Sequence, residues 1–254
     1  MQSAIASFYD NLADDYHLIF EDWDKSIERQ AAILGPLLEQ YTGQVAPRVL
    51  DCACGIGTQS IGLSLRGHKL VASDLSQTSV LRAEREAVHR GATIQFHLAD
   101  MRNLSFLPDG EFDAVIAADN AISHLLLKKD RDQALQEMAK KLRPEGTWLA
   151  TIRDYDRLIQ TRPASQPPSF FAERGNRRIV HQLWDWEGED YDLHLYISLE
   201  VSKQWLVKHF VSRYHALQRD DLSDSLQQAG FTSIQWLEPT ETSFYQPIVI
   251  AAKQ

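Results

Sequence analysis

The sequence predicts an α/β fold, with a doubly wound, mostly parallel seven-stranded sheet that carries a small antiparallel β insertion. Strand and helix patterns alternate over roughly a hundred residues after position 47, which requires right-handed crossovers between parallel strands. A proline-rich segment ends the alternation, and three strand-like segments joined by short turns follow it. At 254 residues the chain is long enough to bury the core of such a domain.

The first elements precede and build the sheet. Apolar residues at helical spacing between Ile5 and Phe20, and again over about 27–40, predict two helical segments. Strands are then expected at 48–51, 69–73, 93–98, 112–117 and 147–152, with helices at about 58–65, 77–90 and 131–142. Ligands on such a sheet bind at the carboxyl ends of the strands, so the residues that follow each strand deserve most weight.

The pattern changes after Arg153. Three prolines, Pro163, Pro167 and Pro168, remove backbone donors and fix φ, so residues 161–169 are expected to be a loop. Strands at 178–186, 191–201 and 204–214 then form the insertion, and a helix at 220–229, strand 231–237 and strand 246–252 complete the sheet. We therefore expect a helical cap at 1–45, a ligand-binding α/β domain at 46–160 and 217–254, and an antiparallel insertion or lid at 161–216.

Composition narrows the choice of partner. The formal net charge of −9 disfavours a nucleic-acid partner, because such binding draws its affinity from Lys and Arg. No stretch approaches the roughly 20 apolar residues of a membrane helix, and the N-terminus lacks the features of a signal peptide. We expect a cytoplasmic protein with a small-molecule substrate and no membrane partner, and leave a homo-oligomer open.

The segment VLDCACGIGT, residues 49–58, predicts a ligand site. Glycine at 55 and 57 lets the backbone turn sharply between a strand and a helix whose free N–H groups suit an anion, while Asp51 suits a cation. A dinucleotide site would prefer glycine where Ser60 stands and would not favour Asp51 beside a pyrophosphate. The ammonium, carboxylate and sulfonium of S-adenosylmethionine match this turn better. Without its neighbours, the turn remains compatible with a plain strand-to-helix connection.

Two further acids follow successive strands. Asp74 comes 19 residues after Gly55, where an acid can accept hydrogen bonds from both ribose hydroxyls of an adenosine. Asp100 and Met101 follow the third strand, where a carboxylate can accept from the adenine amino group beside an apolar contact. Each acid alone is equally well explained as a helix cap or a solvated strand end. Together with Asp51, they predict a cofactor site.

The chain resembles class I S-adenosylmethionine methyltransferases over essentially its whole length, and within them glycine N-methyltransferase and related bacterial small-molecule N-methyltransferases. The resemblance is carried by VLDCACGIGTQS (49–60), FDAVIAADNAISHL (112–125) and IRDYDRLI (152–159). It implies a Rossmann-like methyltransferase fold. The sequence departs from the glycine enzymes at Asp119, where they tend to have glycine, and at Ile152, where they tend to have histidine, so the acceptor stays open.

The resemblance also implies roles for individual residues. It places Asp51, Gly55 and Gly57 at the methionine end of the cofactor, Asp74 with its neighbour Leu75 at the ribose, and Asp100 with Met101 at the adenine. The backbone of Ala118 and the side chain of His124 would also lie beside the cofactor. Asn120 would lie near the methyl acceptor, and Arg153 would hold the carboxylate of an amino acid substrate.

Methyl transfer from a sulfonium needs a neutral nucleophile about 3 Å from the methyl carbon, so positioning matters more than a strong acid or base. Asn120 either accepts from an amine or caps the following helix, and Arg153 either binds a carboxylate or pairs with Asp154 or Asp156. Tyr155 either lines the pocket or packs. We do not assign His124 as a general base, since an orienting hydrogen bond is commoner there.

Aromatic residues are expected to cover the site. Tyr9 and Tyr16, on the N-terminal segment, can close over the cofactor, and some of the aromatic residues of the insertion can line a lid. The histidines at 181, 194, 209 and 215 have no ligand spacing, so no metal is expected. Cys52 and Cys54 are expected to be buried free thiols.

Three functions are favoured, and modification of nucleic acid or protein is a further option; the acidic net charge counts against base methylation. The first is an N-methyltransferase of a small amine that bears a carboxylate, such as glycine or sarcosine. The second is an O- or N-methyltransferase of a larger aromatic or heteroaromatic metabolite. The third is a non-catalytic, S-adenosylmethionine-binding regulatory protein.

Overall fold

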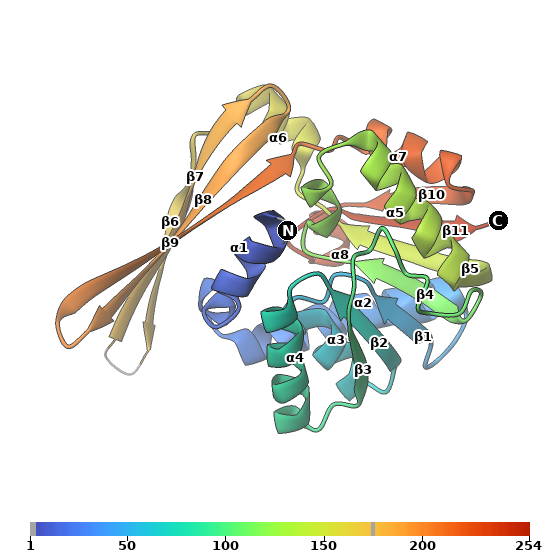
Figure 1. Cartoon of the computed structure of the whole chain (residues 1–254), viewed down its shortest axis with the longest axis horizontal. Coiled ribbons are helices and arrows are strands. Elements are labelled where there is room, and N and C mark those ends of the chain that lie inside the picture. The colour runs from blue at the N-terminus through green and yellow to red at the C-terminus, as the bar shows by residue number, and fades with distance from the viewer. Residues whose placement is uncertain (1–3, 174–175) are drawn as a thin grey trace.

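The computed structural model describes residues 4–173 and 176–254, which form two sheets and their helices (Figure 1). The larger sheet contains β1 (Arg48–Asp51), β2 (Lys69–Asp74), β3 (Ile94–Leu98), β4 (Phe112–Ala117), β5 (Leu142–Thr151), β10 (Phe231–Leu237) and β11 (Ile248–Lys253). The smaller sheet contains β6 (Ser165–Glu173), β7 (Asn176–Glu187), β8 (Asp190–Val201) and β9 (Gln204–His215). The helices are α1 (Ala4–Leu12), η1 (Tyr16–Ile19), α2 (Trp23–Thr42), α3 (Thr58–Leu65), α4 (Gln77–Arg90), η2 (Ala121–His124), α5 (Lys128–Lys141), α6 (Tyr155–Thr161), α7 (Arg219–Gln228) and α8 (Pro239–Thr242).

The larger sheet has the strand order β10-β11-β5-β4-β1-β2-β3. Strands β1 to β5 pair in parallel, and β11 runs antiparallel to both of its neighbours. The order reverses beside β1, and ligands bind at such a switch point on this fold. The predicted doubly wound, mostly parallel seven-stranded sheet with an antiparallel insertion is confirmed.

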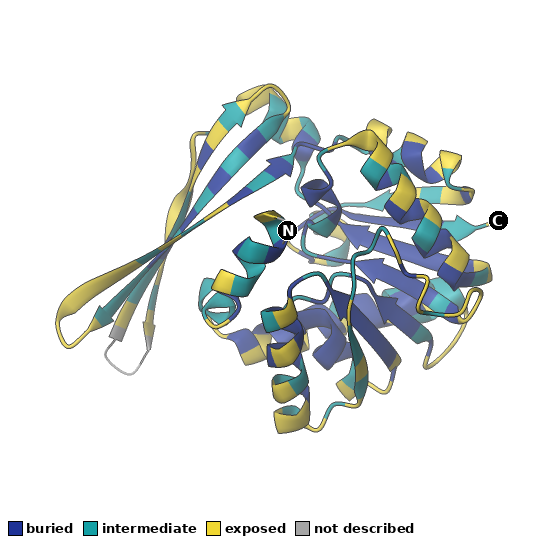
Figure 2. Ribbon diagram, viewed as in Figure 1, coloured by how far each residue is buried: buried dark blue, intermediate teal, exposed yellow. Residues whose placement is uncertain are grey.

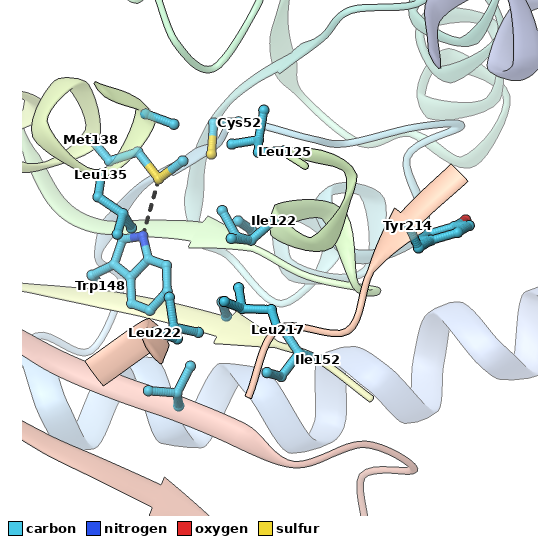
Figure 3. Close-up of a cluster of buried hydrophobic side chains, with 14 of the residues drawn as sticks. Cys52, Ile122, Leu125, Leu135, Met138, Trp148, Ile152, Tyr214, Leu217 and Leu222 are labelled. Carbon is cyan, nitrogen blue, oxygen red and sulfur yellow. Dashed lines mark hydrogen bonds between the residues drawn. The ribbon is translucent and has the colours of Figure 1, made fainter. Parts of the chain in front are cut away.

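Two hydrophobic cores hold the sheet from its two faces. On one face α2 packs Leu34 and Leu38 against alternate residues of β1, β4 and β5, among them Val49. On the other face α5 and α7 cover the intervening residues, and the indole N–H of Trp148 donates to the sulfur of Met138 over 3.1 Å (Figure 3). Because side chains alternate along a strand, one sheet fills both cores and its strand ends keep fixed positions.

The proline-rich segment differs from its prediction. A loop was expected over 161–169, but β6 begins at Ser165 and pairs with β7. Pro167 and Pro168 are tolerated because β6 is an edge strand whose pairing with β7 shifts register between Gln166 and Ser169. The short helix α6 was also not foreseen, and the Asp154 side chain caps it by accepting from the backbone N–H of Arg157. The other three predicted strands of the insertion are confirmed.

The smaller sheet forms an arm that leans over the carboxyl ends of the larger sheet, with α1 between them (Figure 1). The side chains of the inner part of the arm, near the larger sheet, are largely buried, and Tyr191 of β8 has no exposed surface. Its outer part is largely exposed, as Figure 2 shows, and includes Leu206 and Val207 of β9. The arm therefore contributes side chains to the site only through its inner part.

The three-part division of the chain stays a prediction. None of the helices described is both long enough and apolar enough to cross a membrane.

Candidate functional site

The turn after β1 is built on two glycines. Gly55 and Gly57 have φ of +52° and +93°, a region that strains residues with a Cβ. A Cβ on Gly57 would also lie 2.9 Å from the Cδ1 atom of Ile61. The Gly55 N–H donates to the Asp74 carboxylate over 2.8 Å, which ties the turn to the end of β2. The glycines thus bring the backbone to the carboxyl edge of the sheet.

The Asp51 side chain stabilises this turn through hydrogen bonds. Its carboxylate accepts from the Ser60 hydroxyl over 2.6 Å and from the Ala53 N–H over 3.2 Å, and the residue is 1% exposed. Burial raises the pKa of Asp51 to about 7, and the Ser60 and Ala53 hydrogen bonds oppose the rise. Asp51 does not line the cavity described next, so its direct contact with a ligand stays a prediction.

A cavity of about 580 Å³ lies at the carboxyl ends of β1, β2 and β4. Most of the residues that we expected around a cofactor line it, namely Tyr16, Gly55, Asp74, Leu75, Asp100, Met101, Ala118 and His124. Gly57 and Asp51 lie behind the wall rather than in it. The structure therefore brings eight of the ten predicted cofactor residues to one cavity.

The two acids in this wall have different surroundings. Asp74 is buried and accepts from the backbone N–H groups of Gly55 and Ser76, and burial raises the pKa of its carboxyl group. Asp100 is half-buried and binds the Arg102 guanidinium, with an N–O distance of 2.6 Å. Burial raises the pKa of Asp100, but the Arg102 hydrogen bonds outweigh it and the net pKa is lowered.

Aromatic residues of the N-terminal segment form one wall of this cavity. The ring of Tyr16 lies against the Gly55 turn, since a Cβ on Gly55 would be 3.5 Å from Tyr16 Cε1. Tyr9 of α1 lies beside Tyr16 and bonds to His124 of η2 over 2.7 Å. Burial lowers the pKa of His124 to about 3, so the ring is neutral at ordinary pH. His124 thus orients Tyr9 through this hydrogen bond.

A second cavity, of about 850 Å³, lies under the inner part of the arm and is lined by Asn120 and Arg153. The Arg153 guanidinium lies over the rings of Trp184 and Tyr214, 4.8 and 5.4 Å from their centroids. It donates to the Tyr191 hydroxyl over 2.7 Å and to the Gln182 side chain over 3.3 Å.

The alternative salt bridge of Arg153 is not formed. Asp154 and Asp156 pair with Arg219, at 3.7 and 3.1 Å. Within the described ranges, Arg153 has no carboxylate at ion-pair distance. A partly buried cation thus faces a cavity without an anion beside it.

Asn120 and Tyr155 form the floor beneath Arg153. The Asn120 side chain donates to the Tyr155 hydroxyl over 2.8 Å, and its oxygen accepts from Ser123 and from the backbone N–H of Arg153. These contacts use both lone pairs of that oxygen. Tyr155 is 1% exposed and lines neither cavity. Both residues position Arg153, and their direct contact with a substrate stays a prediction.

Sequence reasoning missed Asp119, which lines both cavities. Its Oδ2 atom accepts from Gln59 over 2.7 Å, and its Oδ1 atom is buried without a hydrogen-bond partner among the residues described. Burial raises the pKa of Asp119 to about 6, although the Gln59 hydrogen bond and the charge of Arg153 lower it. The signal was present, because Asp119 comes just after β4, and Asp51, Asp74 and Asp100 stand at or just after the ends of β1, β2 and β3.

The remaining candidate groups have simpler surroundings. Cys52 and Cys54 are buried free thiols whose pKa values burial raises. In the part of the chain that the structure covers, no group of three His, Cys, Asp or Glu side chains is arranged to hold a metal ion.

Comparison with known proteins places this geometry in a family. Residues 49–146 match the model of the methyltransferase domain. Glycine/sarcosine N-methyltransferase from Parasynechococcus marenigrum is 36% identical over 139 residues, which are 55% of this chain and 48% of that protein. Residues 49–146 are therefore a methyltransferase domain, and the relatives and the fold support a class I S-adenosylmethionine-dependent methyltransferase. The matched segment spans about half the length of that relative.

Two other methyltransferase comparisons extend the match along the chain. The putative methyltransferase YqeM from Bacillus subtilis is 29% identical over 199 residues, or 74% of each chain. The crystal structure of DesVI from Streptomyces venezuelae superposes with a TM-score of 0.81 at 18% identity, covering 95% of this chain and 98% of that chain. At that identity the likeness is one of fold, and it includes the arm as well as the larger sheet.

The first cavity fits the cofactor of this methyltransferase family. Its volume lies in the usual range for cofactor sites, and Leu75 and Met101 supply apolar surface beside Asp74 and Asp100. Glycine at 55 adopts the φ of +52° without strain and leaves the backbone uncovered beside the Tyr16 ring. Five aspartates and two arginines line this cavity, so acidic groups predominate, which suits a cationic molecule rather than a phosphate.

Proposed function

We propose that this chain is an enzyme that transfers a methyl group from S-adenosylmethionine to the amine of a small, carboxylate-bearing metabolite of the glycine or sarcosine kind. One observation carries the proposal. Arg153 presents a guanidinium to the second cavity, lies near Asp119 where the two cavities meet, and has no carboxylate partner in the described structure. A buried cation is costly unless an anion compensates it, and a substrate carboxylate supplies that anion.

The first cavity would hold the cofactor. Asp74 would accept from the ribose hydroxyls, and Met101 and Leu75 would flank the adenine and ribose, beside the turn at Gly55. S-adenosylmethionine supplies an electrophilic methyl group on a sulfonium. The part of the chain is to fix the acceptor nitrogen in line with that group and to keep water out.

The aromatic side chains of Tyr9 and Tyr16 would keep water out of the site. Tyr9 and Tyr16 line both cavities and come from the N-terminal segment, so closing that segment covers the region where donor and acceptor would meet. Desolvation there strengthens the attraction between Arg153 and a carboxylate. The Asn120 hydrogen bond to the Arg153 backbone fixes where this cation sits. The activity of the glycine/sarcosine relative accords with a site of this kind.

The experiment measures S-adenosylhomocysteine formation with a panel of glycine, sarcosine, other small amino acids and aromatic metabolites. We expect turnover on a carboxylated amine, and Arg153→Ala should raise KM for that amine about ten- to a hundredfold, because a charged hydrogen-bonded pair is lost. Affinity for S-adenosylhomocysteine should change by less than about threefold, since Arg153 does not line the first cavity.

The matched control is Arg177→Ala. Arg177 also lies over an indole ring, that of Trp205, but it is exposed on the smaller sheet and pairs with Glu200. Its removal should leave both kinetic constants unchanged. Cofactor binding without turnover on any member of the panel would contradict the proposal and favour a regulatory role.

The size of the second cavity favours one alternative. About 850 Å³ is far more than glycine fills, and cavities of this size usually hold larger ligands. A larger acceptor, such as an aromatic or heteroaromatic metabolite, would use aromatic side chains that line this cavity, among them Phe20, Tyr214 and Tyr245, as a wall. Turnover on the aromatic members of the panel, unaffected by Arg153→Ala, would favour this second function.

A further inference from the structure

We propose that Asp119 binds the ammonium group of the methyl acceptor and takes its proton before methyl transfer. This inference rests on the proposed function and deepens it, because it makes the acceptor a primary or secondary amine that arrives protonated. It is drawn from three properties of Asp119, namely its position, its unused oxygen and its charged surroundings.

Asp119 lies at the wall of both cavities. Of the many residues that line the two cavities, only Tyr9, Tyr16 and Asp119 line both. With the cofactor in the first cavity and the acceptor in the second, in-line transfer would bring the acceptor nitrogen to the methyl group beside the residues that line both. A side chain that lines both cavities is placed to touch that nitrogen, and Asp119 is the one of the three that is ionisable below neutral pH.

One carboxylate oxygen of Asp119 has no hydrogen-bond partner among the residues described. Gln59 of α3 holds Oδ2 at 2.7 Å, and Gln59 is in turn held by Gln30 of α2. This arrangement fixes the carboxylate and leaves Oδ1 buried with no partner among the residues described. A buried acceptor without a partner is costly, and an ammonium N–H would satisfy it. The left-handed backbone at Asp119, with φ of +55°, adds strain of the sort that is commonly retained at functional sites.

Charged and titratable groups from several elements surround Asp119. The charged and titratable groups that face Asp119 are Asp51 at the end of β1, Tyr16 of η1, Arg153 after β5 and Tyr214 of β9. Arg153 is the cation among them, so the junction offers one anion and one cation to a substrate. A zwitterion of the amino acid kind matches both, with its carboxylate at Arg153 and its ammonium at Asp119.

The proton and electron balance is simple. One proton passes from the acceptor R–NH3+ to Oδ1 of Asp119, which leaves a neutral amine with its lone pair free. That lone pair forms the new N–C bond as the C–S bond breaks, and the electrons of the C–S bond stay on sulfur. The products are R–NH2+–CH3 and S-adenosylhomocysteine, and Asp119 later returns its proton to solvent. Burial raises the pKa of Asp119 to about 6, which makes the carboxylate a better proton acceptor than an exposed one.

The first test is Asp119→Asn, which keeps the shape of the side chain and an oxygen for Gln59. We expect kcat/KM for the amine with the highest turnover in the panel to fall at least about a hundredfold, within the range of general base catalysis. The control, Asp113→Asn, changes a carboxylate at the opposite end of the same strand, where Asp113 pairs with Arg143. That variant should keep the rate of the native protein.

The second test measures binding rather than activity. With S-adenosylhomocysteine saturating, calorimetry compares sarcosine with methoxyacetate, which keeps the carboxylate but replaces the ammonium by an ether oxygen. We expect the native protein to prefer sarcosine at least about tenfold and Asp119→Asn to lose most of this preference. Equal loss of affinity for S-adenosylhomocysteine would instead assign Asp119 to the cofactor and overturn the inference.

The pH profile supplies a third readout. The native kcat/KM should fall about tenfold per pH unit below about 6, because protonated Asp119 can neither hold the ammonium nor take its proton. Asp119→Asn should lack this limb. A limb that persists in the variant belongs to another group, such as Asp51, and overturns the inference.

The two proposals fail differently. Turnover on an amine that Asp119→Asn leaves unchanged overturns this inference alone. A native protein that methylates no amine and binds no sarcosine overturns both it and the proposed function.

Discussion

The Tyr9 hydroxyl lies 2.7 Å from Nε2 of His124, which joins α1 to η2 across 115 residues of sequence. The other ring nitrogen of His124 lies 3.3 Å from the backbone oxygen of Arg213 in β9. Because a carbonyl only accepts, Nδ1 carries the proton and Nε2 accepts from Tyr9. The neutral imidazole therefore fastens the N-terminal helix over the first cavity and links it to the arm.

Tyr9→Phe should loosen this closure. The change leaves the buried Nε2 atom of His124 without its donor, at a cost of about 1–3 kcal/mol. We expect affinity for S-adenosylhomocysteine, measured by calorimetry, to fall about five- to tenfold. Tyr41→Phe is the control, because it removes an exposed hydroxyl that bonds to Gln235. Equal affinities in the two variants would show that the bond does not close the cavity.

The His124 ring should make stability depend on pH. Burial lowers its pKa to about 3, below the unfolded value of about 6.5, so the unfolded chain binds the proton first. The sign follows, because stability is lost as pH falls through this window. The free energy of unfolding of the native protein, relative to His124→Gln, should drop by about 2 kcal/mol between pH 7 and pH 5. Urea titrations at both values measure it, and a constant difference would contradict the low pKa.

The fold was predictable because its signals are local. Alternating strand and helix patterns and the glycines at 55 and 57 depend only on neighbours in sequence, and the structure confirms the sheet they predict. The strand β6 was not predictable, because Pro167 and Pro168 forbid a central strand but are allowed at an edge. Whether a segment lies at an edge depends on the whole sheet.

The site was predictable in part for the same reason. Acids that follow parallel strands must meet at one edge, and Asp74 and Asp100 do line one cavity. The partners of Asp51 and Asn120 were not predictable, since hydrogen bonds within the turn and to Tyr155 depend on distances of a few ångströms. Asp119 was likewise recognised as a candidate only because its Oδ1 atom is buried without a hydrogen-bond partner among the residues described, which no sequence pattern indicates.

Gly62→Ala should destabilise the packing of α2 on α3. A Cβ at Gly62 would lie 2.6 Å from the backbone oxygen of Ile27 and 2.7 Å from the Cβ of Ala31, so helix backbones must move apart. We expect a loss of about 1–3 kcal/mol in the free energy of unfolding, measured by urea denaturation.

Gly35→Ala is its matched control in the same pair of helices. There a Cβ would meet the ends of the Arg66 and His68 side chains, at 3.0 and 3.1 Å, and the Arg66 end can shift. Since alanine also favours a helix over glycine by up to about 1 kcal/mol, this variant should be neutral or stabilising. Similar losses in both variants would show that the contact with Ile27 is not the cause.

Asp74→Asn should weaken cofactor binding more than Asp100→Asn. The Asp74 carboxylate is oriented by backbone N–H groups of Gly55 and Ser76, whereas Asp100 already binds the Arg102 guanidinium. An amide at 74 must turn one N–H group toward these donors or toward the ligand, which loses an acceptor in either case. Loss of a charged hydrogen bond corresponds to a drop in affinity of about ten- to a hundredfold.

Calorimetry with S-adenosylhomocysteine measures both variants, and Asp100→Asn should lose less than about fivefold because its Arg102 partner already screens the charge. Adenosine, which keeps the ribose and the base but lacks the amino acid, separates the contributions further. If Asp74 faces the ribose, Asp74→Asn must weaken adenosine as much as S-adenosylhomocysteine. A loss confined to S-adenosylhomocysteine would move the contact of Asp74 to the methionine end, beside Gly55.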